Sequence, residues 1–149
     1  VKLEGAHLAT VEKLTASGIP VMGHLGLTPQ SLHQLGGYRV QGRTDGDAIV
    51  EAAIALEKAG AFAIVLELVP ADLASRISKA LTVPTIGIGA GTDCDAQVLV
   101  WTDMAGLTAN PPKLAKAYRN LRKELMGAAQ EFAEEVRSGK FPTESQTFH

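Results

Sequence analysis

Four side chains suited to acid–base or metal chemistry lie at the ends of short strand-like runs: Lys2, Glu4, His24 and Glu67. Lys2 and Glu4 are two residues apart, so in a strand both side chains project from the same face. A cation and a carboxylate would then meet at one strand end. The spacing fits both a functional site and a solvent-exposed ion pair, and by itself it does not choose between them.

Glu67 follows the apolar run AFAIVL at residues 61–66, which is typical of a strand buried in a parallel sheet. Partial burial would favour the protonated form of this carboxylate and would suit a proton acceptor. The alternative is an acid that interacts with the N-terminus of a helix beginning near Pro70. His24 ends the run PVMGH, and a lone histidine beside glycines is more often structural than catalytic.

Two glycine-rich segments are candidates for binding loops. Residues 25–44 form a long polar segment that we expect to shape a pocket or a lid. The segment GIGAGTDCD at residues 87–95 lacks a complete GxGxxG pattern and a Walker lysine, so nucleotide binding is not indicated. Its residues Asp93, Cys94 and Asp95 do not have the spacing of a zinc site. Asp103 is interpreted as a helix cap.

Composition restricts the class of protein. The chain has 149 residues, 46% of them hydrophobic, which suits one domain or a large piece of one. The 14 basic and 16 acidic residues are mixed along the chain, so neither nucleic acid nor an anionic membrane is an expected partner. A single cysteine, no apolar run of about 20 residues and no signal-like start favour a cytoplasmic protein. Since VKLEG enters a strand without any lead-in, we expect upstream sequence to be missing.

Strand-like runs alternate with helical patterns, which is the signature of parallel β/α units. Strands are expected at residues 1–3, 20–24, 61–66, 84–88 and 97–102, and helices at 7–17, 45–59 and 70–81, with Asp45 as a helix cap and Gly18 and Gly60 at helix ends. A long amphipathic helix or helix pair is expected over residues 112–138, with apolar positions Leu114, Tyr118, Leu121, Leu125, Phe132 and Val136.

Four or five such units are half of a (β/α)8 barrel, which has about 250 residues in full. A doubly wound sheet is the structural competitor. We favour the barrel because several strands end in polar residues. In a doubly wound sheet we would expect such residues at the one pair of strands that forms the binding crevice.

Five segments resemble the ketopantoate hydroxymethyltransferase family in their order and spacing. They are VKLEGA at residues 1–6, PVMGHLGLTPQS at 20–31, LGGYRVQGR at 35–43, AGAFAIVLELVP at 59–70 and VPTIGIGAGTDCDAQVLVWTDMAGL at 83–107. The resemblance implies a (β/α)8 barrel of the phosphoenolpyruvate/pyruvate type, with only its C-terminal β/α units present. Residues 1–149 would be the C-terminal part of one barrel domain, and residues 112–138 its C-terminal helical segment.

The resemblance also implies a metal-dependent transferase of pantothenate biosynthesis. The reaction would move a hydroxymethyl group from 5,10-methylenetetrahydrofolate to 3-methyl-2-oxobutanoate, with a divalent metal such as Mg²⁺. By motif position, Lys2 would bind the oxo acid, Glu4 the metal, and Glu67 would accept the proton. His24 corresponds to a pocket histidine of the family.

The sequence departs from the family pattern in two small ways and one large one. Ala6 replaces the second glycine of LEGG, and Ala96 stands where a glycine is common. Two metal-binding aspartates and a substrate-binding serine of the family belong to N-terminal strands that this sequence does not contain. We therefore expect this segment alone to be inactive, and the missing barrel segment to be its first partner.

Two other functions remain open. One is a related barrel lyase or mutase acting on a 2-oxo acid, which the segments GHLGLTPQ and LELVP disfavour. The other is a non-enzymatic half-barrel that serves as an assembly module, with its open sheet edges covered by a partner. The resemblance further implies a homo-oligomer, in which Tyr118, Leu121 and Leu125 would contact a neighbouring copy.

Overall fold

The computed structural model describes all 149 residues, which form two compact units, Val1–Val98 and Leu99–His149. All four candidate site residues belong to the first unit. Neither unit contains a helix with the length and apolar character needed to cross a membrane.

The first unit is built on a five-stranded parallel sheet. Its strands are β1 (Lys2–Glu4), β2 (Met22–Gly26), β3 (Ala63–Glu67), β4 (Thr85–Ile88) and β5 (Ala96–Gln97). They lie in the order of the sequence, and each pairs in parallel with the next. A doubly wound sheet reverses its strand order at a switch point, and this sheet has no reversal. The expected parallel α/β organisation is confirmed.

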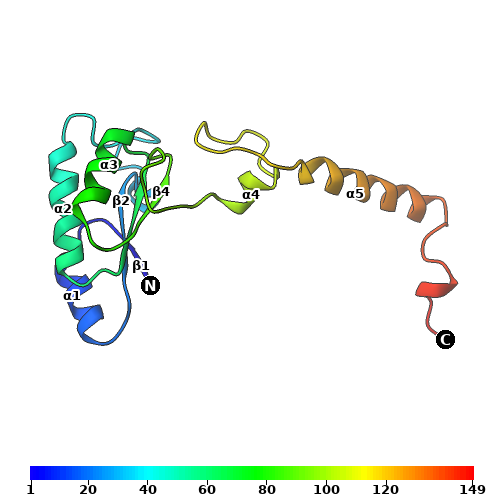
Figure 1. Ribbon diagram of the computed structural model, residues 1–149. Coiled ribbons are helices and arrows are strands. Elements are labelled where there is room, and N and C mark those ends of the chain that lie inside the picture. Colours follow the sequence, from blue (N-terminus) through cyan, green and yellow to red (C-terminus); the bar gives the residue numbers. More distant parts are fainter. The chain divides into compact units, whose positions relative to one another are not determined.

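Three helices connect the first four strands: α1 (Leu8–Ala16), α2 (Gly46–Lys58) and α3 (Ala71–Ala80). They lie on the same side of the sheet (Figure 1). The helices expected at residues 7–17, 45–59 and 70–81 are each found within one residue of their expected ends. A short 3₁₀ turn, η1 (Pro29–Ser31), lies in the long connection between β2 and α2. Asp45 stands at the N-cap position of α2, but its side chain makes no capping hydrogen bond, so the predicted cap is not formed.

The core lies between these helices and one face of the sheet. It contains Val11 from α1, Ala53 and Leu56 from α2, Leu73 and Ile77 from α3, and Leu25, Ile64 and Leu66 from the strands. Side chains alternate along a strand, so a strand that turns Leu25 or Leu66 toward the helices turns its neighbours the other way. His24, Val65 and Glu67 therefore face away from the helices.

The second unit contains α4 (Trp101–Met104), α5 (Leu121–Arg137) and the 3₁₀ turn η2 (Glu144–Gln146). Asp103 is its one buried residue, and α5 buries none of its side chains. This unit has no hydrophobic core of its own.

The strand predicted at residues 97–102 is wrong. β5 ends at Gln97, and Trp101 begins the short helix α4. Strand pairing stops because β4 ends at Ile88, and the last ladder-like bond runs from the Val98 amide to the Gly87 carbonyl. Asp103 lies inside α4 instead of capping a helix, and its carboxylate accepts a hydrogen bond from the Thr108 hydroxyl.

The helical segment predicted at residues 112–138 is correct only in its second part. α5 begins at Leu121, after Asn120, whose side chain accepts a hydrogen bond from the Lys123 amide at 3.2 Å. In the preceding segment, the Tyr118 amide donates to the Met104 carbonyl rather than to a carbonyl one helical turn earlier. Leu114 and Tyr118 therefore lie outside the helix, while Leu121, Leu125, Phe132 and Val136 lie on it.

Candidate active site

Pairing of β1, β2 and β3 brings together all four residues predicted from the sequence. Glu4 is opposite His24 in the β1–β2 register, and Gly26 is opposite Glu67 in the β2–β3 register. The Lys2 ammonium lies 3.5 Å from Glu4 Oε1 and 3.1 Å from His24 Nδ1. On the other side of the ring, His24 Nε2 lies 3.1 Å from Glu67 Oε2. We call this group, Lys2, Glu4, His24 and Glu67, the strand-end cluster.

The strand-end cluster is largely shielded from solvent. The side chains of His24, Glu4 and Glu67 are 1%, 7% and 15% exposed, whereas that of Lys2 is 47% exposed. Charge interactions are stronger away from water, so these groups affect one another more than a surface ion pair would. In the Lys2–Glu4 pair the carboxylate is shielded from solvent, while the lysine remains half exposed.

The two ring nitrogens of His24 differ in their bonding. Nδ1 has Lys2 Nζ within hydrogen-bond distance. Nε2 is buried and forms no hydrogen bond, although Glu67 Oε2 is close enough by distance. The two atoms are close enough for an ion pair, but the oxygen does not lie in the direction that a hydrogen bond from the ring nitrogen requires. A hydrogen bond weakens steeply when its atoms are poorly aligned. We therefore treat Nε2 as unpartnered.

The connection between β2 and α2 holds both glutamates through backbone amides. The Gln30 amide in η1 donates to Glu4 Oε2 at 2.9 Å, and the Leu27 amide donates to the Glu67 carbonyl at 2.8 Å. Sequence reasoning expected this connection to shape a pocket. It could not identify Gln30, because a backbone N–H carries no residue-type signal.

The residue after Glu67 has an unusual backbone. Leu68 has φ +48°, in the left-handed region that residues with a side chain seldom adopt. Its amide donates to the Ile88 carbonyl at 3.0 Å, and its carbonyl accepts from the Gln41 amide at 2.9 Å. Backbone bonds on both sides thus hold the end of β3 where Glu67 stands.

Glu4 is the metal ligand that the sequence predicts in this chain. No group of three or more His, Cys, Asp or Glu side chains has the geometry to hold a metal ion. Mg²⁺ takes near-octahedral oxygen coordination, commonly with one or two carboxylates together with waters and substrate oxygens. Glu4 offers one carboxylate, and one of its oxygens is already bonded to the Gln30 amide.

Asp95, noted in the glycine-rich segment, has a structural role. Its Oδ2 accepts hydrogen bonds from the Thr85 amide at 2.8 Å and the Thr85 hydroxyl at 2.9 Å. These bonds hold the pKa of Asp95 below its ordinary value. The carboxylate fixes the beginning of β4 to the β4–β5 connection, and it lies outside the strand-end cluster.

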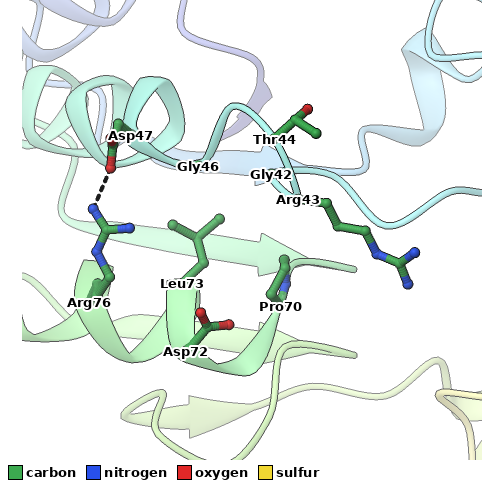
Figure 2. Close-up of a pocket in the computed structure, with 9 residues that line it drawn as sticks. All are labelled: Gly42, Arg43, Thr44, Gly46, Asp47, Pro70, Asp72, Leu73 and Arg76. Carbon is green, nitrogen blue, oxygen red and sulfur yellow. Dashed lines mark hydrogen bonds and ion pairs between the residues drawn. The ribbon is translucent and has the colours of Figure 1, made fainter.

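A separate cavity of about 490 Å³ lies where α2 and α3 begin (Figure 2). Arg76 forms an ion pair with Asp47 across it, and Arg43 and Asp72 also line it. Two arginines and two aspartates give the cavity no preferred ligand charge. None of the four residues of the strand-end cluster lines it.

The fold and the cluster define a class of protein: a parallel α/β protein in which two carboxylates, a histidine and a lysine from three neighbouring strands lie close together. The chain matches the family model described as ketopantoate hydroxymethyltransferase over residues 1–144. It belongs to that family.

Three relatives are each named 3-methyl-2-oxobutanoate hydroxymethyltransferase. The chain is 57% identical to the protein of Thermobifida fusca (strain YX), over 99% of this chain and 54% of the relative. It is 58% identical to that of Acidothermus cellulolyticus, over 99% of this chain and 56% of the relative. For Acaryochloris marina the values are 58% identity, 95% of this chain and 57% of the relative. The chain thus spans about half the length of the curated relatives it matches.

Proposed function

We propose that this chain is the C-terminal part of a (β/α)8 barrel enzyme that transfers a hydroxymethyl group from 5,10-methylenetetrahydrofolate to 3-methyl-2-oxobutanoate, giving ketopantoate. Family membership and the names of the relatives support the reaction. The sequential parallel order of the strands supports the barrel, because strands of such a barrel follow one another around it. The observation that carries the proposal is the strand-end cluster, where a buried carboxylate, an imidazole and an ammonium meet.

The chemistry requires removal of the proton from C3 of the oxo acid. Glu67 would take this proton, and the C–H bonding electrons would pass into an enolate whose negative charge lies on the former keto oxygen. The Lys2 ammonium would stabilise that anion by its charge, which acts strongly in a site with little water. Water would add to the methylene carbon of 5,10-methylenetetrahydrofolate, and cleavage of its two C–N bonds would release tetrahydrofolate and formaldehyde. The enolate carbon would then attack the formaldehyde carbon, and the former carbonyl oxygen would take a proton and become the hydroxyl group of ketopantoate.

The family resemblance also suggests a divalent metal, which would act as a Lewis acid toward the keto and carboxylate oxygens of the substrate. This chain offers it Glu4, and the remaining ligands would have to come from outside the chain. Of the residues in this chain, Glu67 would take the proton and Lys2 would face the anion.

The experiment is carried out on a protein that includes an upstream part, as the relatives do. Glu67→Gln keeps the shape of the side chain and removes the base. We expect turnover and the exchange of the C3 proton of 3-methyl-2-oxobutanoate with deuterated water to fall about 10²- to 10⁴-fold. Deuterium incorporation is followed by proton NMR without folate, so it reports the first step alone.

The matched control is Glu51→Gln, which changes an exposed glutamate of α2. It should leave both rates unchanged. If Glu67→Gln exchanged the C3 proton as fast as the unaltered protein, Glu67 would not be the base.

A second candidate is the non-enzymatic assembly module. It is favoured by the free edge of β1, which pairs with β2 on one side only. An exposed strand edge can pair with another chain. A protein with this function would show no enzyme-dependent exchange at C3, so the same measurement separates the two candidates.

A further inference from the structure

His24 Nε2 is the one buried side-chain nitrogen or oxygen in the structure that has no hydrogen-bond partner. A buried polar atom left unpaired destabilises the folded state, because it has given up its hydrogen bond to water without gaining another. Native proteins rarely keep such an atom unless a ligand or water satisfies it. The position of Nε2 beside Glu67 therefore points to an acceptor that is supplied from outside the chain.

The bond at the other ring nitrogen determines which nitrogen carries the proton. A lysine ammonium has three donors and no acceptor. Lys2 Nζ lies 3.1 Å from His24 Nδ1, and two donors cannot face each other at that distance. Nδ1 must accept from Lys2, and the proton of a neutral ring then lies on Nε2.

The two carboxylates near the ring do not reverse this assignment. Glu4 Oε1 would favour a proton on Nδ1, but it is 3.6 Å away, beyond hydrogen-bond reach. Glu67 Oε2 lies on the Nε2 side, where it favours a proton on that nitrogen. Lys2, Glu4 and Glu67 are the charged groups in contact with the ring.

We propose that Lys2, besides facing the substrate anion, fixes His24 as the neutral Nε2–H tautomer and so positions it, and that this N–H donates to an oxygen of the bound 2-oxo acid. His24 then acts as a hydrogen-bond donor and not as a base, which agrees with Glu67 as the proposed base. The identity of the ligand rests on the proposed function, whereas the tautomer does not.

The tautomer is read from the ¹⁵N chemical shifts of labelled histidine in this chain without substrate, at one pH near neutrality. The four histidines are distinguished by comparison with a His24→Gln spectrum. We expect a proton-bearing shift for Nε2 and a lone-pair shift for Nδ1. In Lys2→Met, which removes the donor but keeps an apolar chain, a population with the proton on Nδ1 should appear.

Two control variants accompany this comparison. Lys2→Arg retains a donor and should preserve the Nε2–H tautomer, while Lys13→Met changes an exposed lysine of α1 and should alter nothing. A proton on Nδ1 in the unaltered chain, or an unchanged tautomer in Lys2→Met, would overturn the assignment.

The donor role is tested with two amides in a protein that includes the upstream part. The side-chain N–H of glutamine reaches the place of Nε2, whereas that of asparagine reaches only the place of Nδ1. We expect His24→Asn to raise the KM for 3-methyl-2-oxobutanoate about 10- to 100-fold, as for loss of a hydrogen bond to a charged group, and His24→Gln to raise it much less. Equal effects of the two substitutions would overturn the donor role. Absence of all turnover in the unaltered protein would instead count against the proposed function. It would not affect the tautomer assignment, which is measured without substrate.

Discussion

Gly26 allows β2 and β3 to approach closely beside Glu67. It has φ +89°, and a Cβ atom at this position would lie 2.1 Å from the Glu67 carbonyl oxygen. The same oxygen accepts the Leu27 amide at 2.8 Å, so it cannot move away without loss of that bond. We expect Gly26→Ala to destabilise the chain by more than about 2 kcal/mol, because the left-handed backbone alone costs about 1–2 kcal/mol with a side chain. Urea unfolding measures the change.

Gly18 is the matched control for this prediction. It has φ +78°, and a Cβ atom there would meet nothing within 4 Å. Gly18→Ala should therefore lose only the backbone contribution, about 1 kcal/mol. Equal losses in the two variants would show that the contact with the Glu67 carbonyl contributes nothing.

Through Glu57, the stability of the first unit depends on pH. Its carboxylate accepts hydrogen bonds from the Thr82 hydroxyl at 2.7 Å, the Thr82 amide at 2.7 Å and the Val83 amide at 3.0 Å. These bonds lower the pKa of Glu57 below its ordinary value of 4.5. A lowered pKa means stability that is present above pH 4.5 and lost as the pH falls through the folded-state pKa.

We therefore expect Glu57→Gln to unfold more easily than the unaltered chain at pH 7. The difference should shrink as the pH falls below about 4.5, because the unaltered carboxylate is then protonated as well. Urea midpoints measured between pH 3 and pH 7 test this, with Glu51→Gln as the exposed control. A difference that stayed constant over this range would contradict the role given to the charge.

The positions of the four candidate side chains on their strands were predictable from the sequence, while the hydrogen bonds that they form were not. Alternation along a strand placed Lys2 and Glu4 on one face, and the apolar run before Glu67 placed that residue at a strand end. The bond from the Gln30 amide to Glu4 depends on the path of a loop, and the choice of His24 tautomer depends on a distance across two strands. No pattern of residue types encodes either of these.

The secondary-structure predictions are wrong where a segment lacks the backbone hydrogen-bond partners that the predicted element would need. QVLVWT is rich in β-branched and aromatic residues, which is typical of a strand, yet β4 ends before it could pair along its whole length. The residues before α5 fit a helix by periodicity, but the Tyr118 and Leu121 amides bond to carbonyls of Met104 and Ala105 instead. In both segments the available backbone hydrogen-bond partners decide the structure, and not the secondary-structure preference of the residues.

Helix α5 differs from the helices of the first unit in having no buried side chain. Leu121, Leu125 and Phe132 are 41%, 60% and 54% exposed. Isolated helices of such length are marginal in water, and most helix stability comes from a packed apolar face. We expect the amides of α5 in this chain to exchange with deuterium within about tenfold of the rate of an unstructured peptide, far faster than those of β2 and β3. Hydrogen-exchange mass spectrometry gives this comparison.

If α5 were as protected as β3, its apolar side chains would have to be covered. The variant Leu121→Asp would then show what covers these side chains. Loss of protection together with a smaller size on a sizing column would indicate a second copy of the chain, in agreement with the homo-oligomer expected from the sequence.

For the whole molecule, the decisive fact is that the chain spans about half the length of the relatives while holding the entire strand-end cluster. The proposed base, the positioning lysine and the histidine donor are all present. A group of side chains able to hold a metal ion is not formed within the chain. Under the proposed function, Glu67 of this chain would accept the proton, and further metal ligands would come from the rest of the barrel.

This division predicts complementation. We expect the purified chain alone to give no folate-dependent turnover of 3-methyl-2-oxobutanoate, and the same chain mixed or co-expressed with the N-terminal part of the Thermobifida fusca relative to gain turnover that requires Mg²⁺. The chain carrying Glu67→Gln is the control, because it retains the strand edges that bind the added part and lacks the base. If it complemented as well as the unaltered chain, the base would belong to the other half. Turnover by the isolated chain would show that Glu4 and the substrate suffice to hold the metal.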